Sequence, residues 1–301
     1  MTLRAAVAFV CGVALAACGC QRQKTGGLSA PPPSASPSRT AIRTIEWTFS
    51  GVSPRAVVVM PAAVPWNQKL PVVIALHGRG EAVKGPEEGV WGWPRDYGLA
   101  TAFERLLSPP LTERDFQGFV TPSHLGLRNN ALRERPFGGL IVVCPYFPDK
   151  DPASDFTKLY ARFLVDELVP RIARELPADT SRLGIDGVSL GGAVALRVGL
   201  SHPQLFRSVG AIQPAIQARQ VDELVALAAG AKISQPDLRL RVMTSEGDYF
   251  RTAIEAYDRA LDAKSIAHEF LLARGPHDYP FNRGPGSIEL LFWHERALAA
   301  R

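Results

Sequence analysis

The chain has 301 residues, of which 46% are hydrophobic and 21% are charged, with a formal net charge of +5. This length and apolar content suffice for one substantial hydrophobic core and favour a single folded domain. The positive excess is small and scattered, without clusters of basic and aromatic residues. A nucleic-acid partner is therefore not expected.

The first residues indicate export from the cell. Residues 1–4 are a short basic start, and residues 5–17 form an apolar run that is short for spanning a bilayer. The run ends in Leu15-Ala16-Ala17-Cys18, which resembles a bacterial lipobox and implies cleavage before Cys18 and lipidation of that cysteine. We therefore expect residues 1–17 to be a lipoprotein signal peptide and the mature protein to be lipid-anchored in the bacterial cell envelope. The alternative is an ordinary secretory signal that is cut nearby.

Residues 18–40 are rich in Ser, Pro, Gly and Ala. Such a stretch cannot bury enough apolar surface to fold, so we predict a flexible tether there and a catalytic domain over residues 41–301. Only Cys144 lies within that domain, in an apolar run that predicts a buried thiol. No metal-ligand spacing is present, and neither a metal nor an organic cofactor is expected.

The hydrophobic pattern after residue 40 predicts strands first, and then strands that alternate with helices. Alternating apolar residues at 44–49 are typical of a half-buried strand. Apolar runs rich in valine and isoleucine, typical of strands buried on both faces, occupy residues 56–60, 72–76 and 140–144. Further strands are predicted at 183–185, 208–212, 238–243 and 268–272, and helices at 156–175, 190–200, 252–263 and 287–299. This order predicts a three-layer α/β architecture, with a mostly parallel central sheet and helices on both faces.

One connection is much longer than the others. About sixty residues separate the strand that ends at Leu76 from the strand near residue 140, where most connections have about 4–6. We predict that this insertion, residues 80–138, shapes the substrate pocket and contains one helix at 97–107. Trp91 and Trp93 are candidate substrate-binding residues because indole rings stack on aromatic or sugar rings. Alternatively, they pack the insertion against the sheet.

Residues 187–191 read Gly-Val-Ser-Leu-Gly, a Gly-x-Ser-x-Gly motif between a predicted strand and a predicted helix. A sharp strand-to-helix turn strains the backbone of the serine and requires very small neighbours, which Gly187 and Gly191 provide. The turn exposes the hydroxyl at a helix N-terminus, where N–H groups favour developing negative charge. Ser189 is therefore the predicted nucleophile.

A serine hydroxyl needs a base to remove its proton. His277 lies in a turn-rich loop after the last predicted strand, which is a suitable place for that base. Two other late histidines, His268 at the start of a strand and His294 within a helix, are expected to be structural or on the surface. His277 is therefore the predicted base.

A carboxylate is needed to orient the imidazole and stabilise its charged form. The loop after the strand at 238–243 offers Asp248, with Glu246 as the second choice. The order Ser189, Asp248, His277 is the order expected for a nucleophile on such a strand-to-helix turn.

Two backbone N–H groups are expected to bind the oxyanion of the tetrahedral intermediate. Leu190 directly follows the nucleophile and supplies the first. The second is expected from the glycine-rich loop after the strand at 72–76, where Arg79 N–H is the first choice and Gly78 N–H the next. His77 in this loop is expected to orient the loop, because its place before the serine does not suit a base.

These residues resemble a known family. Asp-Gly-Val-Ser-Leu-Gly-Gly at 186–192, His-Pro-x-x-Phe at 202–206 and Val-Gly-Ala at 209–211 are similar to the esterase D group of α/β hydrolases. That group includes feruloyl and acetyl-xylan esterases, siderophore esterases, S-formylglutathione hydrolases and mycolyl transferases. The resemblance covers most of residues 70–299. It implies the α/β-hydrolase fold, a Ser189–His277–Asp248 triad and an oxyanion site beside Gly78, whereas the insertion is longer than the family usually has.

The expected activity is hydrolysis of a carboxylic ester, small or attached to a polysaccharide, through an acyl-serine intermediate. One alternative is acyl transfer from the same intermediate to another alcohol. A second alternative is a non-catalytic lipoprotein that binds envelope components, but a binding module has no need of nucleophile, acid and base in this order. The sequence makes no prediction of oligomeric state.

Overall fold

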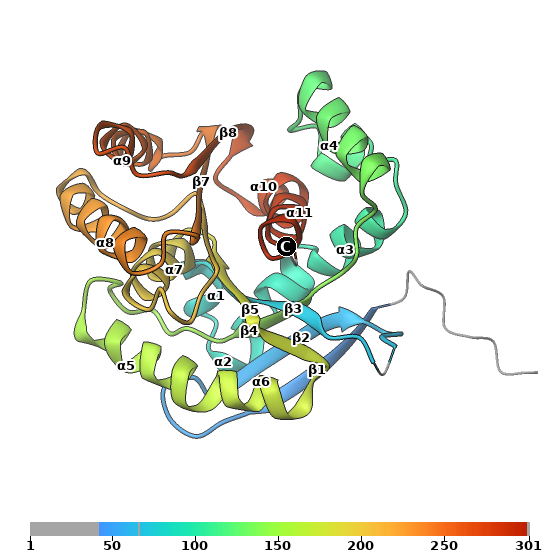
Figure 1. Cartoon of the computed structure of the whole chain (residues 1–301), viewed down its shortest axis with the longest axis horizontal. Coiled ribbons are helices and arrows are strands. Elements are labelled where there is room, and N and C mark those ends of the chain that lie inside the picture. Colours follow the sequence, from blue (N-terminus) through green and yellow to red (C-terminus); the bar gives the residue numbers. More distant parts are fainter. Residues whose placement is uncertain (1–41, 66, 300–301) are drawn as a thin grey trace, which may run out of the picture. The chain divides into compact units, whose positions relative to one another are not determined.

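The computed structural model describes residues 42–65 and 67–299. The expected signal peptide and the whole of the expected tether, with the lipidation site at Cys18, lie outside the described residues. The folded part is built on one eight-stranded sheet with the strand order β1-β2-β4-β3-β5-β6-β7-β8 (Figure 1). β1 pairs antiparallel with β2, and β2 pairs antiparallel with β4, whereas all other neighbouring strands are parallel.

The strands agree in order with the sequence prediction. They are β1 (Ile42–Thr48), β2 (Arg55–Pro61), β3 (Leu70–Leu76), β4 (Ile141–Pro145), β5 (Ala178–Gly187), β6 (Ser208–Ile212), β7 (Arg239–Gly247) and β8 (Glu269–Pro276). The largest difference is β5, which begins five residues before the predicted start at residue 183, because residues 179–182 are polar and are half-buried or exposed.

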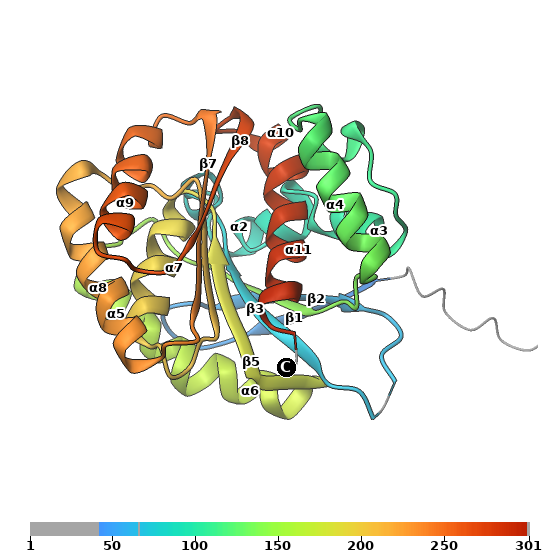
Figure 2. The same cartoon turned by 45° about the horizontal axis from the view of Figure 1, so that its top comes forward.

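Helices cover both faces of the sheet, which confirms the predicted three-layer class (Figures 1 and 2). One face is covered by α5 (Asp155–Phe163), η3 (Leu164–Leu168), α6 (Val169–Glu175), α7 (Leu190–Ser201), α8 (Val221–Ser234) and α9 (Arg251–Ala263). The other is covered by α3 (Leu99–Leu107), α4 (Pro122–Glu134) and α11 (Ser287–Ala297). The shorter segments are α1 (Arg79–Ala82), α2 (Pro86–Gly89), η1 (Gly92–Asp96), η2 (Glu113–Phe116), η4 (Ala218–Gln220), α10 (Tyr279–Phe281) and η5 (Asn282–Gly286).

The sheet separates two apolar clusters. Successive side chains of a strand point to opposite faces, so Val58 packs toward α5–α9 while Val57 and Val59 pack toward α3 and α11. Both faces of the central strands are therefore covered by helices, which explains why these strands have unbroken apolar sequences. Cys144 of β4 is a buried free thiol, as predicted.

Two of the longer helices, α8 and α4, were not predicted. α8 buries Val221, Leu224, Val225, Ala228 and Ala231, a spacing typical of an amphipathic helix that the sequence analysis did not use. α4 lies in the insertion and buries only Leu132, so its sequence has no apolar stripe to reveal it. The insertion therefore contains several short helical segments instead of one helix.

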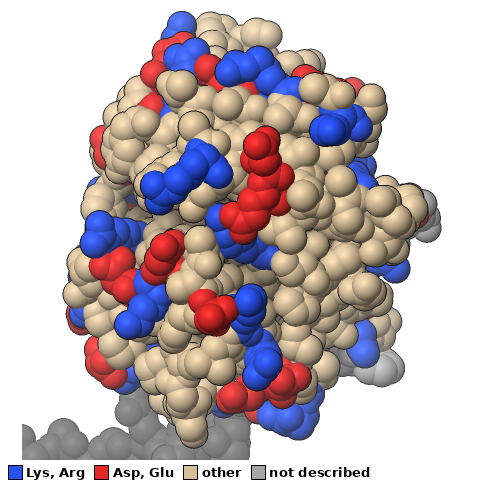
Figure 3. All heavy atoms as spheres, turned by 90° about the vertical axis from the view of Figure 1, so that its left-hand side faces the viewer, with Lys and Arg blue, Asp and Glu red and all other residues tan. Residues whose placement is uncertain are grey.

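The face of the molecule over α8 and α9 has positive and negative side chains interspersed, without a field of one sign (Figure 3). Between residues 42 and 299, residue 66 apart, none of the helices is both long and apolar enough to cross a bilayer.

Candidate active site

Ser189 lies at the tight turn between β5 and α7, with φ 55° and ψ −117°. This conformation is strained for a residue with a side chain, and it is typical of a nucleophile elbow. The neighbours must be glycines: a Cβ on Gly187 would lie 2.4 Å from the Gly191 carbonyl, and one on Gly191 would lie 2.3 Å from the Leu76 oxygen. A backbone hydrogen bond from Ser189 N–H to the Ile212 oxygen (3.0 Å) fixes the turn to β6.

Asp248 and His277 come from the loops after β7 and β8, and the structure brings them together. His277 Nδ1 lies 2.9 Å from Asp248 Oδ1, and both side chains are largely buried. The carboxylate also accepts hydrogen bonds from the Thr244 hydroxyl (2.8 Å) and from Phe250 N–H (2.9 Å). With Nδ1–H donated to the acid, Nε2 of the imidazole is the basic nitrogen.

Gln213, which directly follows β6, joins the end of β7 to the loop that carries His277. Gln213 Nε2 donates to the Ser245 hydroxyl (2.7 Å) and to the Pro276 oxygen (3.0 Å), next to His277. Among the described residues no hydrogen bond joins the Ser189 hydroxyl to His277; such bonds often tighten only when substrate is bound. Gln213 was not among the predicted site residues, because a lone glutamine after a strand has no motif.

The expected oxyanion loop lies beside the nucleophile, since a Cβ built on Gly78 would be 3.6 Å from Ser189 Cβ. Gly78 N–H donates to the Tyr97 hydroxyl (3.1 Å), so this second-choice donor is already engaged. Arg79 and Leu190 begin α1 and α7, and the first N–H of a helix has no acceptor within the helix. These two N–H groups remain the candidate oxyanion donors.

His77 is buried, and its ring connects this loop to the segment after β4. Its Nε2 accepts from Phe147 N–H (3.1 Å), so Nδ1 carries the proton and donates to the Gly78 oxygen (3.0 Å). Burial lowers the pKa of His77 to about 4, which keeps the ring neutral and this tautomer in place. This geometry fits an orienting residue.

The two tryptophans of the insertion do not form an exposed surface on which a substrate ring could stack. Trp93 is fully buried and its Nε1 donates to the Leu76 oxygen (2.9 Å) at the end of β3. It therefore packs the insertion against the sheet, which was the alternative interpretation. Trp91 is half-buried against the same apolar cluster.

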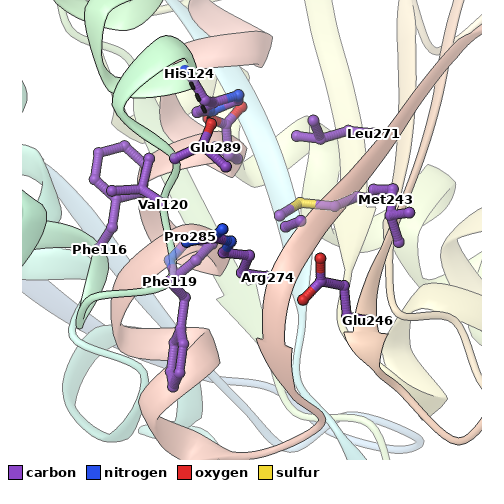
Figure 4. A pocket seen from close by; sticks show the side chains of 13 residues that line it. Phe116, Phe119, Val120, His124, Met243, Glu246, Leu271, Arg274, Pro285 and Glu289 are labelled. Carbon is purple, nitrogen blue, oxygen red and sulfur yellow. Dashed lines mark hydrogen bonds and ion pairs between the residues drawn. The ribbon is translucent and has the colours of Figure 1, made fainter.

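A pocket lies between the insertion and the face of β7 and β8 (Figure 4). Phe116, Phe119 and Val120 form one wall, and Met243 and Leu271 form the other. Glu246 lines this pocket, and among the described residues its side chain makes no hydrogen bond or ion pair with His277, whereas Asp248 does.

Glu289 of α11 also lines this pocket, and its buried side chain forms ion pairs. Its carboxylate accepts two hydrogen bonds from the Arg128 guanidinium (2.8 Å each) and one from His124 Nε2 (2.7 Å), and Arg241 lies 3.6 Å away. Burial raises the pKa of Glu289, but Arg128 and His124 outweigh this and hold it well below its usual range. The insertion is thus tied to the last helix by charge.

Replacing Glu289 with glutamine should lower the free energy of unfolding at pH 7 by about 3–5 kcal/mol, because the partner charges stay buried without compensation. The depressed pKa means that the contribution is complete above the unfolded-state pKa of about 4.3 and is lost as the pH falls below it. Urea unfolding at pH 7 and below pH 4 measures both effects. Glu175→Gln removes a half-exposed surface ion pair with Arg171 and should lower the free energy of unfolding far less than Glu289→Gln does. Equal losses in the two variants would contradict this role of Glu289.

Comparison with known proteins gives one matching family and many solved structures with a similar fold. Residues 142–277 match the family described as "Putative esterase". The chain is similar to a solved ferulic acid esterase (TM-score 0.62, 16% identity, 86% of this chain and 98% of that chain). It is also similar to an S-formylglutathione hydrolase from Staphylococcus aureus (TM-score 0.57, 14% identity, 86% and 98%).

A feruloyl esterase module from Clostridium thermocellum, solved with sinapinate, shares the fold as well (TM-score 0.57, 16% identity, 87% of this chain and 92% of that chain). Comparison with curated proteins finds no match. At these identities the structural likeness establishes the fold, and the family match covers β4 to His277, which includes the elbow and the acid loop. Residues 142–277 are therefore similar to this esterase family, and the solved esterase and hydrolase structures share the α/β fold of the chain.

Proposed function

We propose that this protein hydrolyses carboxylic esters through an acyl-serine intermediate on Ser189, with His277 as general base and Asp248 as its orienting acid. The observation that supports this most strongly is the 2.9 Å contact between His277 Nδ1 and Asp248 Oδ1, beside a serine in a strained elbow. A purely structural serine does not need that backbone conformation.

In the first half of the reaction, His277 Nε2 takes the proton of the Ser189 hydroxyl as its oxygen attacks the ester carbonyl carbon. The carbonyl oxygen becomes an oxyanion, which accepts hydrogen bonds from Leu190 N–H and Arg79 N–H in the proposed reaction. The protonated imidazole, stabilised by Asp248, then gives its proton to the leaving alcohol. The products of this step are the free alcohol and the acyl-serine.

In the second half, a water molecule gives a proton to His277 and attacks the acyl carbon. The same two N–H groups bind the second oxyanion. When this intermediate collapses, the imidazole returns the proton to Ser189, and the carboxylic acid leaves. No metal or organic cofactor takes part in the proposed reaction.

For the acyl group we propose an aromatic acid of the ferulate type. The structural neighbours include ferulic acid esterases and a complex with sinapinate. In this chain Tyr249 is 71% exposed and its ring lies 4.3 Å from that of His277 between centroids, at a tilt of 32°. An exposed aromatic ring beside the base offers a surface on which a substrate ring can stack.

Turnover of methyl ferulate and of p-nitrophenyl esters of increasing chain length tests this proposal, with acid and alcohol quantified separately. We expect equal amounts of both products and a preference for methyl ferulate that Tyr249→Ala reduces. Hydrolysis of short p-nitrophenyl esters alone would contradict the acyl group. Acid formed in a smaller amount than alcohol, in the presence of a second alcohol, would indicate acyl transfer.

We also propose that the protein is exported and anchored by lipid at Cys18. The support is the lipobox-like Leu15-Ala16-Ala17-Cys18 after an apolar run. In a bacterial host that processes lipoproteins, we expect the protein in the membrane fraction, with a mass that shows loss of residues 1–17 and addition of acyl chains. Cys18→Ser should move it out of that fraction; the same distribution for both proteins would contradict the anchor.

A further inference from the structure

A buried carboxylate lies directly behind the expected oxyanion loop. The side chain of Glu81 in α1 is 1% exposed, and it is enclosed by the insertion: a Cβ on Gly92 would lie 2.7 Å from Glu81 Cγ, and one on Gly89 would lie 2.2 Å from the Glu81 oxygen. Burial raises the pKa of Glu81. The hydrogen bond from the Tyr279 hydroxyl and the charge of Lys84 lower it, but they do not outweigh the burial. Burying a carboxylate is costly unless it is hydrogen-bonded, so its partners define what it does.

The first partner connects Glu81 to the oxyanion loop. The Tyr97 hydroxyl donates to Glu81 Oε2 and accepts from Gly78 N–H (3.1 Å). On its other side, the Gly78 carbonyl accepts from His77 Nδ1–H (3.0 Å). Both ends of Gly78 are thereby fixed, which sets the direction of the next peptide and of its donor, Arg79 N–H.

The second partner connects Glu81 to the histidine loop. Tyr279 lies two residues after His277, and its hydroxyl donates to Glu81 Oε1 (2.5 Å). Lys84 Nζ lies 3.2 Å from the same hydroxyl and 3.4 Å from Glu81 Oε1. One carboxylate therefore joins a loop that contributes an oxyanion donor to the loop that contributes the base.

We propose that Glu81 is a positioning residue for ester hydrolysis, holding Arg79 N–H and His277 in register through Tyr97 and Tyr279. This inference rests on the function proposed above. The distance between the oxyanion donor and the base matters only as the tetrahedral intermediate forms, since a bound ester needs neither group in its final place. Loss of Glu81 therefore weakens transition-state binding more than substrate binding.

Glu81→Gln retains the shape of the side chain and removes an acceptor. We expect kcat to fall by about 10–100-fold, less than the loss of an oxyanion donor itself, while KM changes less than about threefold. The affinity for phenylboronic acid, which forms a tetrahedral adduct with the serine, should fall by the same factor as kcat/KM. Each rate is divided by the concentration of active sites, which is measured by fluorophosphonate labelling on long incubation. Unfolded protein therefore does not lower the measured kcat.

Tyr97→Phe and Tyr279→Phe break the two connections separately and provide a test if Glu81→Gln does not fold. Each should lower kcat, and combining either with Glu81→Gln should cost less than the product of the single losses. Glu88→Gln, which removes an exposed acid paired with Arg95 in the same insertion, is the matched control and should leave kcat unchanged.

The inference is overturned if kcat per labelled site and phenylboronic acid affinity stay within twofold of wild type in Glu81→Gln, or in both tyrosine variants. It is also overturned if KM rises while kcat is unchanged, since that would place Glu81 in substrate binding. A wild-type protein that hydrolyses no ester would instead reject the proposed function itself.

Discussion

Replacing Ser189 with alanine is expected to lower kcat for ester hydrolysis by about 10⁵–10⁶-fold. The variant keeps the base and both candidate oxyanion donors, but it has no oxygen that can form the acyl intermediate. Residual turnover would then depend on direct attack by water in a site shaped for the oxyanion. Steady-state rates with methyl ferulate and p-nitrophenyl acetate, with melting temperatures for both proteins, measure the effect.

Ser201→Ala is the matched control for this variant. Ser201 is exposed at the C-terminal end of α7, the helix that begins directly after Ser189. It should retain wild-type rates, since it contacts neither the elbow nor the loops after β7 and β8. Retention of more than about 1% of wild-type kcat by a folded Ser189→Ala protein is incompatible with a nucleophile at this position.

Changing Asp248 to asparagine has the second largest expected effect, a loss of about 10³–10⁴-fold in kcat. The carboxylate accepts from His277 Nδ1–H, from Phe250 N–H and from the Thr244 hydroxyl. An amide has one acceptor oxygen, and its NH₂ group facing the ring would require an unprotonated Nδ1. The proton would then lie on Nε2, the nitrogen that must accept the serine proton. Steady-state kcat and KM of Asp248→Asn with p-nitrophenyl acetate measure this loss.

Glu246→Gln distinguishes the two acids that the sequence left open. Its carboxylate lines the pocket beneath the insertion, so the substitution should change kcat by less than about threefold with p-nitrophenyl acetate. A larger loss in Glu246→Gln than in Asp248→Asn would assign the acid role to Glu246.

The fold was predictable because its signals are local. Strands buried on both faces have continuous apolar sequences, and the order of strands and helices limits the architecture to a few choices. The Gly-x-Ser-x-Gly motif between a strand and a helix predicts an elbow, because the strained turn permits only glycines at 187 and 191.

The supporting residues were not predictable in the same way. Gln213, Glu81 and Tyr97 act through contacts between segments far apart in the chain, such as the contact of Glu81 with Tyr279, 198 residues away. No spacing rule relates such positions, and each residue type is ordinary in a loop or a short helix. Trp93 shows the reverse error, since an aromatic residue in an insertion suggested a binding surface, yet its indole fills the core under the loop.

The central claim, a Ser189 hydroxyl activated by His277, is tested most directly by locating the adduct of a fluorophosphonate by peptide mass spectrometry. In the wild-type protein we expect one modified peptide, with the phosphonyl group on Ser189, and the same treatment of His277→Ala should leave that peptide unmodified. An adduct on any other residue, or equally fast labelling of Ser189 without the imidazole, would contradict it.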